Sequence, residues 1–373
     1  MSTLFDQTRI GSLELKNRFV RSATYDALAD AEGKVTENQI NFYTKLANGG
    51  VGLILTGITN VIPSGKITMD HNSIHSDDYV QGLKQLTTSV HQKGAKIAVQ
   101  LFHAGKDRAG LLKALNITDE KALAPSFLNN DTEYNEYYRS MTENDILKII
   151  QAFGDAAVRA KEAGFDAVQI HGAHSYLFSQ FLSPLTNQRI DNWGGSLENR
   201  LRIHHETLKD IKEKVGEDYP VLIKFGIYDG LPGGLKFSEG KKAAQYLAEF
   251  GFDAIEVSNG LRGDDYEESE FKTKIDSPER EAYFRDYCRE IKSLVNIPVL
   301  MVGGLRSFEL INDIIKKKDA DYVSLCRPFI REPDIVNRWE SGNSRKSKCI
   351  SCNKCIDDIV MQGKQLCCAI IDD

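Results

Sequence analysis

The sequence predicts an α/β fold in which eight parallel strands close into a (β/α)8 TIM barrel. Short β-branched runs alternate with amphipathic helices across glycine-containing or polar loops, which is typical of parallel strands joined by crossover helices. Several of these runs are apolar throughout, as expected for strands that are buried on both faces. The length of 373 residues suits one large barrel with a single core.

Eight strands are expected, each separated from the next by enough chain for a helix. They are NRFVRSA around Arg18, GLILT from Gly52, KIAVQLF from Lys96, AVQI from Ala167, VLIKF from Val221, AIEVS from Ala254, PVLMVG from Pro298 and YVSLC from Tyr322. The clearest helix precedes the AVQI strand, where apolar residues recur at helical spacing from Ile146 to Ala160. Thr142 is its expected N-cap, with Asp145 at the third helical position completing a capping box.

Two segments lie outside these repeating units. Residues 106–141 fit no barrel unit, and because they follow the third strand we expect a capping loop at the carboxyl end of the barrel, where barrel enzymes keep their active sites. The barrel itself is expected over residues 1–340. A cysteine-rich tail follows over residues 341–373, and in a reducing compartment such a cluster favours metal binding over disulfides.

The composition limits the partners and the location of the protein. Lys and Arg number 47 against 53 Asp and Glu, a formal charge of -6 that argues against a nucleic-acid surface. No apolar run approaches the roughly 18 residues of a membrane helix, and the start of the chain lacks the pattern of a secretory signal. We therefore expect a cytoplasmic protein that acts on small molecules, and the possibility of a homo-oligomer stays open.

Polar side chains gather at the carboxyl ends of the expected strands. They are Thr24, Gln100, His171, His174, Tyr176, Lys224 and Ser258. Each alone is readily explained as a structural residue. Together they indicate one functional site at the open end of the barrel. Buried polar groups need hydrogen-bond partners, and a barrel core alone would not require such groups.

The last two strands end in a pattern that favours a phosphate. Strand seven ends in VGGLRS and strand eight in CRPF, and barrels commonly bind phosphate with the loops after these strands. Gly303 and Gly304 would bring amides close to the oxygens. Arg327 is stronger evidence for a phosphate site than the two glycines, because a guanidinium matches the geometry of a phosphate group.

The segment HGAHSYLFSQFLSPLTNQRIDNWGGSLENR, from His171 to Arg200, is similar to the signature of the old yellow enzyme family, the flavin-dependent ene-reductases also called NADH:flavin oxidoreductases. The likeness extends to NRFVRSAT, GGVGLILTG, QLFHAG, LIKFG and the GG and RPF elements near the end. The resemblance implies a barrel that holds flavin mononucleotide (FMN), takes electrons from NADH or NADPH, and passes hydride to an electron-poor alkene.

The resemblance also implies a role for each site residue. His171 and His174 would donate hydrogen bonds to the carbonyl oxygen of an α,β-unsaturated substrate, where charge develops during hydride transfer. Tyr176 would protonate the α carbon from the opposite face. Lys224 and Gln100 would contact the pyrimidine edge of the flavin. Main-chain groups around Ala23, Thr24 and Gly57 would line the ring, and Gly303, Gly304 and Arg327 would hold its phosphate.

The sequence departs from the family pattern in two places. Tyr25 stands where one subgroup carries a cysteine that tunes the flavin. The tail resembles the cluster segment of dienoyl-CoA reductase and trimethylamine dehydrogenase, although the middle spacing there is one residue longer. Cys349, Cys352 and Cys355, with Cys367 or Cys368 as a fourth thiolate, would bind an iron-sulfur cluster or zinc. A reduced tail without metal is the alternative.

Two other functions stay open at this point. An amine dehydrogenase or demethylase of the trimethylamine dehydrogenase type would need an aromatic cage for a cation, for which the capping loop offers Tyr134, Tyr137 and Tyr138. The chain could also be a barrel that binds metal or protein without catalysis. A zinc site at His171 and His174 is disfavoured, because their spacing follows a strand and no acidic third ligand lies nearby.

Overall fold

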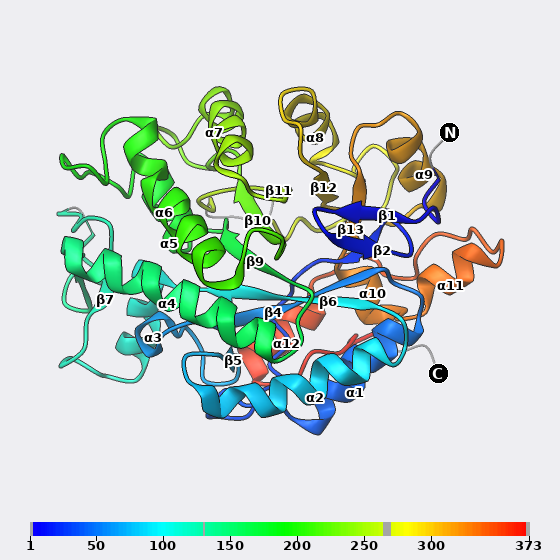
Figure 1. Ribbon diagram of the computed structural model, residues 1–373, viewed down its shortest axis with the longest axis horizontal. Helices are drawn as coiled ribbons and strands as arrows, with labels where there is room; N and C mark the ends of the chain where they lie inside the picture. The colour runs from blue at the N-terminus through cyan, green and yellow to red at the C-terminus, as the bar shows by residue number, and fades with distance from the viewer. Residues whose placement is uncertain (1–2, 130, 264–269, 371–373) are drawn as a thin grey trace.

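The computed structural model describes residues 3–129, 131–263 and 270–370. Its centre is a closed ring of parallel strands (Figure 1). The ring runs through β3 (Phe19–Arg21), β4 (Leu53–Asn60), β6 (Lys96–Phe102), β9 (Ala167–Gly172), β10 (Val221–Gly226), β11 (Ala254–Ser258), β12 (Val299–Val302) and β13 (Tyr322–Leu325). It closes because β3 pairs with both β4 and β13. The predicted barrel and all eight of its strands are confirmed.

Helices surround this ring and bury their apolar faces against it (Figure 1). Those between consecutive strands are α1 (Glu37–Asn48), α2 (Val80–His91), α4 (Glu143–Glu162), α5 (Leu177–Leu182), α6 (Leu197–Val215), α7 (Phe237–Phe250), α8 (Arg285–Lys292) and α9 (Phe308–Lys316). The capping box predicted for α4 is present, since Thr142 accepts from the Asp145 amide and the Asp145 side chain accepts from the Thr142 amide.

The amino-terminal end of the barrel is plugged. A hairpin of β1 (Thr8–Ile10) and β2 (Leu13–Leu15) packs Ile10, Leu13 and Leu15 against inward-facing strand residues such as Leu222 and Leu300. This plug leaves the carboxyl end of the strands as the open face of the barrel.

None of the described helices combines the length and the apolar character that crossing a membrane would require.

The segment expected as a capping loop has secondary structure of its own. It contains η3 (Gly105–Asp107), α3 (Arg108–Ala114) and a parallel pair of short strands, β7 (Ala122–Ala124) and β8 (Tyr138–Ser140). Two other 3-10 turns, η1 (Pro63–Gly65) and η2 (Asp77–Tyr79), and the short strand β5 (Asn72–Ser73), extend the loop after β4. The capping segment is therefore a small folded unit.

The cysteine-rich tail packs onto the loops at the open end of the barrel. It follows α10 (Arg327–Arg331) and α11 (Ile335–Glu340) and contains α12 (Lys354–Gln362). Ile359 and Leu366 of the tail form an apolar cluster with Ala27 and Ile330. The Leu366 amide also donates to the carbonyl of Asp26. The tail thus forms part of the wall around the open face.

Candidate active site

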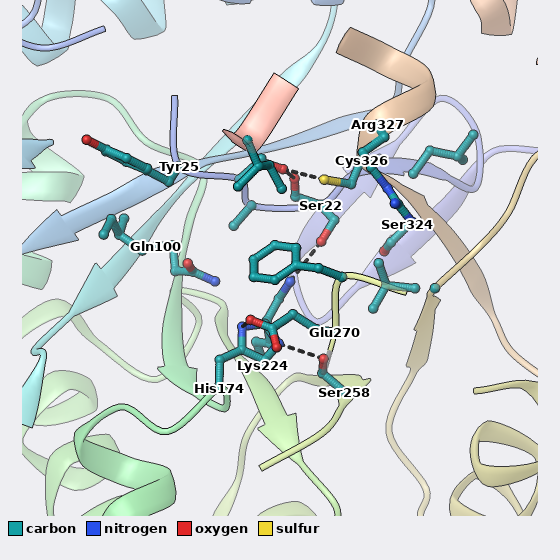
Figure 2. A pocket seen from close by; sticks show the side chains of 18 of the residues that line it. Ser22, Tyr25, Gln100, His174, Lys224, Ser258, Glu270, Ser324, Cys326 and Arg327 are labelled. Carbon is teal, nitrogen blue, oxygen red and sulfur yellow. Dashed lines mark hydrogen bonds and ion pairs between the residues drawn. The ribbon is translucent and has the colours of Figure 1, made fainter. Parts of the chain in front are cut away.

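A cavity of about 310 Å³ opens at the carboxyl ends of the strands (Figure 2). Its volume lies in the range of small-molecule sites. Eleven of the predicted site residues line it: Ala23, Thr24, Gln100, His171, His174, Tyr176, Lys224, Ser258, Gly303, Gly304 and Arg327. Gly57 is not one of the lining residues, and its amide donates to the Tyr43 hydroxyl 2.8 Å away.

The turn after β9 brings His171, His174 and Tyr176 together. The ring of His171 lies 5.0 Å from that of His174 and 5.0 Å from that of Tyr176, measured between centroids. His174 and Ser175 have φ values of 60° and 65°, an uncommon conformation for residues other than glycine. Their amides donate to the carbonyls of Asn259 and Gly260 after β11. These bonds fix the unusual turn, which directs all three side chains into the cavity.

The two histidines are uncharged at neutral pH. Burial, together with the neighbouring Lys224 and Arg262 cations, holds the pKa of both well below the usual value. A neutral imidazole carries one N–H and one acceptor nitrogen. His171 Nδ1 accepts from the Ala173 amide at 3.4 Å, a contact that favours the tautomer with its proton on Nε2. His174 Nε2 lies 2.7 Å from Ser258 Oγ.

A buried polar chain crosses the floor of the cavity. Lys224 Nζ donates to Ser22 Oγ at 2.8 Å (Figure 2). It also lies 3.3 Å from Glu256 Oε2. Gln169 donates to the same carboxylate at 3.0 Å, and Gln100 donates to Gln169 at 2.7 Å. The Lys224 ammonium is thus held as a fixed cation beneath the cavity, as an electron-rich ligand edge would require.

The opposite end of the cavity suits a phosphate-bearing ligand. Gly303 and Gly304 have φ values of 114° and 69°, and a Cβ at Gly303 would come within 2.6 Å of Tyr283 Cε2. The Arg327 guanidinium lines this end and donates to Asn353 Oδ1 at 2.5 Å. Ser324 Oγ is buried without a hydrogen-bond partner among the described residues. An arginine, a glycine turn and an orphaned hydroxyl fit the phosphate and ribityl parts of FMN.

The sequence did not single out several residues of this cavity. Arg262 and Glu270 lie on its wall beside His174, and Phe271 is next to them. Arg262 donates from Nε to Glu270 Oε1 at 2.9 Å, and its guanidinium carbon lies 5.0 Å from the Tyr176 ring centroid. Cys326 also lines the cavity, with its sulfur 2.7 Å from Thr24 Oγ1.

The tyrosines of the capping segment lie elsewhere. Tyr134, Tyr137 and Tyr138 pack with Ala109 and Leu112 in a separate apolar cluster. None of the three lines the cavity. The aromatic cage considered for a cationic amine is therefore not formed by these residues.

A second cavity of about 30 Å³ lies among the tail cysteines. Cys349, Cys352, Cys355 and Cys368 line it, whereas Cys367 is exposed. Burial raises the pKa of the Cys355 thiol to about 12. Within the described residues, no three His, Cys, Asp or Glu side chains are arranged to hold a metal ion. The structure thus gathers four thiols around one cavity, with Cys368 as the fourth, without arranging them as a formed metal site.

Comparisons with known proteins identify relatives over the whole chain. An NADH oxidase of Thermoanaerobacter brockii is 39% identical over 372 residues, which cover 98% of this chain and 55% of the relative. A cinnamate reductase of Clostridium sporogenes is 32% identical over 372 residues, which cover 94% of this chain and 55% of the relative. The chain therefore spans about half the length of these two relatives.

Solved structures show the same fold. Histamine dehydrogenase from Rhizobium sp. 4-9 superimposes with a TM-score of 0.85 at 27% identity, covering 98% of this chain and 52% of that one. Morphinone reductase in complex with tetrahydroNAD gives a TM-score of 0.75 at 26% identity, covering 94% of each chain. FMN and NAD(P)H fit this group of proteins. Residues 3–346 match the model of the NADH:flavin oxidoreductase / NADH oxidase family, so the chain belongs to this family.

Proposed function

We propose that the protein uses FMN and NADH or NADPH to reduce the C=C bond of α,β-unsaturated carbonyl compounds. The observation that carries the proposal is the convergence of His171, His174 and Tyr176 on one cavity that also contains Lys224 and Arg327. The cinnamate reductase among the relatives acts, by its name, on an unsaturated acid, which supports this class of reaction.

The cavity residues divide between cofactor and substrate. Gln100 and Lys224 would hold the pyrimidine edge of FMN, the chain at Ala23 and Thr24 would line the ring, and Gly303, Gly304 and Arg327 would hold the phosphate. When bound, FMN accepts hydride from NADH or NADPH and supplies it to the alkene. The fixed Lys224 ammonium would stabilise negative charge at the ring edge.

The histidines and the tyrosine act on the substrate. His171 presents an Nε2–H to the carbonyl oxygen, and a donor placed there lowers the barrier as negative charge develops on that oxygen. Tyr176 Oη carries the proton that the α carbon requires. The Phe102 ring packs 4.6 Å from that of Tyr176 and helps to hold it in place.

Amine oxidation is the competing reaction, and histamine dehydrogenase is a structural neighbour. A cationic amine would need an open aromatic face. The face of Tyr176 in this cavity is already covered by the Arg262 guanidinium, 5.0 Å from the ring centroid. The position over this ring that a cationic amine would take is thus already occupied.

We also propose that the tail binds an iron-sulfur cluster or zinc. Four thiolates are the usual ligands of either. The second cavity is lined by Cys349, Cys352, Cys355 and Cys368, so these four supply the proposed ligands and the exposed Cys367 does not.

Anaerobic mixing of the purified holoenzyme tests the main proposal. NADH or NADPH should bleach the yellow flavin absorption, and cyclohexenone should restore it. The double variant H171A/H174A should keep its flavin yet bind phenols weakly and reoxidise slowly. Bleaching by an alkylamine alone would establish the competing reaction, and colourless protein that takes up no FMN would establish a binding barrel without catalysis.

A further inference from the structure

The wall of the cavity already holds one carboxylate. The side chain of Glu270 is 8% exposed, and that of Arg262 beside it is 28% exposed. Arg262 Nε donates to Glu270 Oε1 at 2.9 Å and to Oε2 at 3.2 Å. Figure 2 shows Glu270 beside His174, within the cavity.

One oxygen of that carboxylate faces two donors. Glu270 Oε1 lies 2.9 Å from Arg262 Nε and 3.6 Å from His174 Nδ1. His174 is one of the two residues that would bind the substrate oxygen. A carboxylate at this position therefore contacts both a guanidinium and a histidine of the proposed active site.

We propose that Arg262 is a specificity-determining residue that binds the carboxylate of an α,β-unsaturated acid, and that Glu270 occupies this position until the substrate displaces it. The inference rests on the proposed alkene reduction and names its substrate class. An incoming carboxylate replaces Glu270 as the counter-ion of Arg262, so the charge balance of the cavity is preserved. A neutral aldehyde or amide cannot make that exchange.

The chemistry of such substrates gives Arg262 a second purpose. A carboxylate is a poor activating group, because its negative charge resists the arrival of hydride at the alkene. A guanidinium paired with both oxygens withdraws that charge and is well matched to the planar group.

The first test compares two inert ligands that differ only in charge. Oxidised holoenzyme is titrated with 3-phenylpropanoate and with 3-phenylpropanamide, and the flavin absorbance reports binding. Arg262→Gln should weaken the carboxylate by about 10- to 100-fold relative to the amide, the range for a hydrogen bond to a charged group. Arg289→Gln is the matched control, since Arg289 is exposed on α8 and pairs with Asp286.

The second variant removes the resident competitor. Glu270→Gln should tighten 3-phenylpropanoate by roughly 10-fold while the amide changes little. Equal effects on both ligands in both variants would overturn the inference, because Arg262 and Glu270 would then only shape the wall.

Kinetics separate this inference from the proposed function. With wild-type enzyme, reduction of cinnamaldehyde tests alkene reduction, and the ratio of kcat/KM for cinnamate to that for cinnamaldehyde tests Arg262. The ratio should fall in Arg262→Gln. Aldehyde reduction with an unchanged ratio would contradict only the carboxylate site, whereas no reduction of either compound would contradict the proposed function itself.

Discussion

Lys224 and Glu256 stand directly opposite each other on neighbouring parallel strands, with Lys224 Nζ 3.3 Å from Glu256 Oε2. Both side chains are buried beneath the cavity. Because β10 and β11 pair in this register, the two residues point to the same side of the sheet. The barrel thereby carries a compensated cation into its core, at the position where the flavin edge is expected.

Glu256→Gln tests the importance of that compensation. Glutamine keeps the shape of the side chain but leaves the buried Lys224 cation without its counter-ion. The free energy of unfolding should fall by about 3 kcal/mol, the range for removing one partner of a buried pair. Urea denaturation followed by circular dichroism measures it.

An exposed ion pair gives the comparison for this variant. Glu290 accepts from Lys241 at 3.0 Å with 51% of its side chain exposed. Glu290→Gln should cost less than about 1 kcal/mol. Similar losses of unfolding free energy in the two variants would show that burial of the Lys224–Glu256 pair does not increase its effect on stability.

Asp107 should make the stability of the protein depend on pH. Burial raises the pKa of its carboxyl from 3.8 to about 6, although the Arg262 and Lys106 cations oppose the shift. Between pH 4 and pH 6 the folded protein therefore holds a proton that the unfolded chain has released. The contribution of protonated Asp107 to the free energy of unfolding is therefore fully present below pH 4 and is lost as the pH rises through 6.

Asp107→Asn removes this titration with little change of shape. The unfolding free energy of the variant, relative to wild type, should increase by up to about 3 kcal/mol between pH 4 and pH 7. Urea denaturation at a series of pH values measures the difference. A difference that stays constant across this window would contradict the raised pKa.

Tyr176→Phe should separate the two halves of the catalytic cycle. The variant keeps the ring that packs against Phe102 but lacks the hydroxyl that would protonate the α carbon. Reoxidation of the flavin by cyclohexenone should slow by about 100-fold or more. Reduction of the flavin by NADPH should change little, because that step needs no proton from Tyr176.

Stopped-flow absorbance under nitrogen measures both half-reactions. Tyr137→Phe is a suitable control, because Tyr137 packs in the capping segment and does not line the cavity. Equal slowing of both half-reactions in Tyr176→Phe would indicate a disturbed flavin site and would count against the proposed proton donor.

The barrel could be predicted from the sequence because its strands are buried on both faces. A run such as VLIKF is apolar except for Lys224, and it forms most of β10. The residues at which the strands end were less predictable. The second strand was expected to end at Thr56, whereas β4 continues to Asn60 through a bulge between Leu55 and Ile58. The hydrophobic pattern of a sequence does not show where such a β-bulge occurs.

The same reasoning explains which site residues were found. His171, Lys224 and Gln100 lie on strands whose positions the pattern fixes, and the structure brings them to one cavity. Arg262 comes four residues after the end of β11, and its place beyond a strand end was a usable signal. Glu270 lies twelve residues after the end of β11, so only the folded chain shows that it reaches His174.

The capping segment shows the limit of local pattern. Its three-residue strands β7 and β8 are too short for a period to appear. Its tyrosines were considered for a cage over the site because they follow the third strand. The structure instead buries Tyr138 and partly buries Tyr134 and Tyr137 in a cluster with Leu112, since their apolar rings gain more from packing within the segment.

The two neighbouring cysteines of the tail offer a matched pair for the proposed metal site. Cys368 lines the second cavity with Cys349, Cys352 and Cys355, whereas Cys367 points to solvent. Cys368→Ser should therefore lose most of the bound iron or zinc, and Cys367→Ser should retain it. Elemental analysis of anaerobically purified protein measures the metal, and visible absorption distinguishes a cluster from zinc.

Adjacent residues make this test sharp, because both variants change the same stretch of chain by one sulfur atom. A thiolate ligand must reach the common metal with the other three, and a side chain on the opposite side of the backbone cannot do so without moving the chain. Metal lost from Cys367→Ser and kept in Cys368→Ser would show that the tail rearranges on binding. Wild-type protein without metal would instead support a tail of reduced thiols, held in place by the packing of Ile359 and Leu366 and by hydrogen bonds such as that from the Leu366 amide to the Asp26 carbonyl.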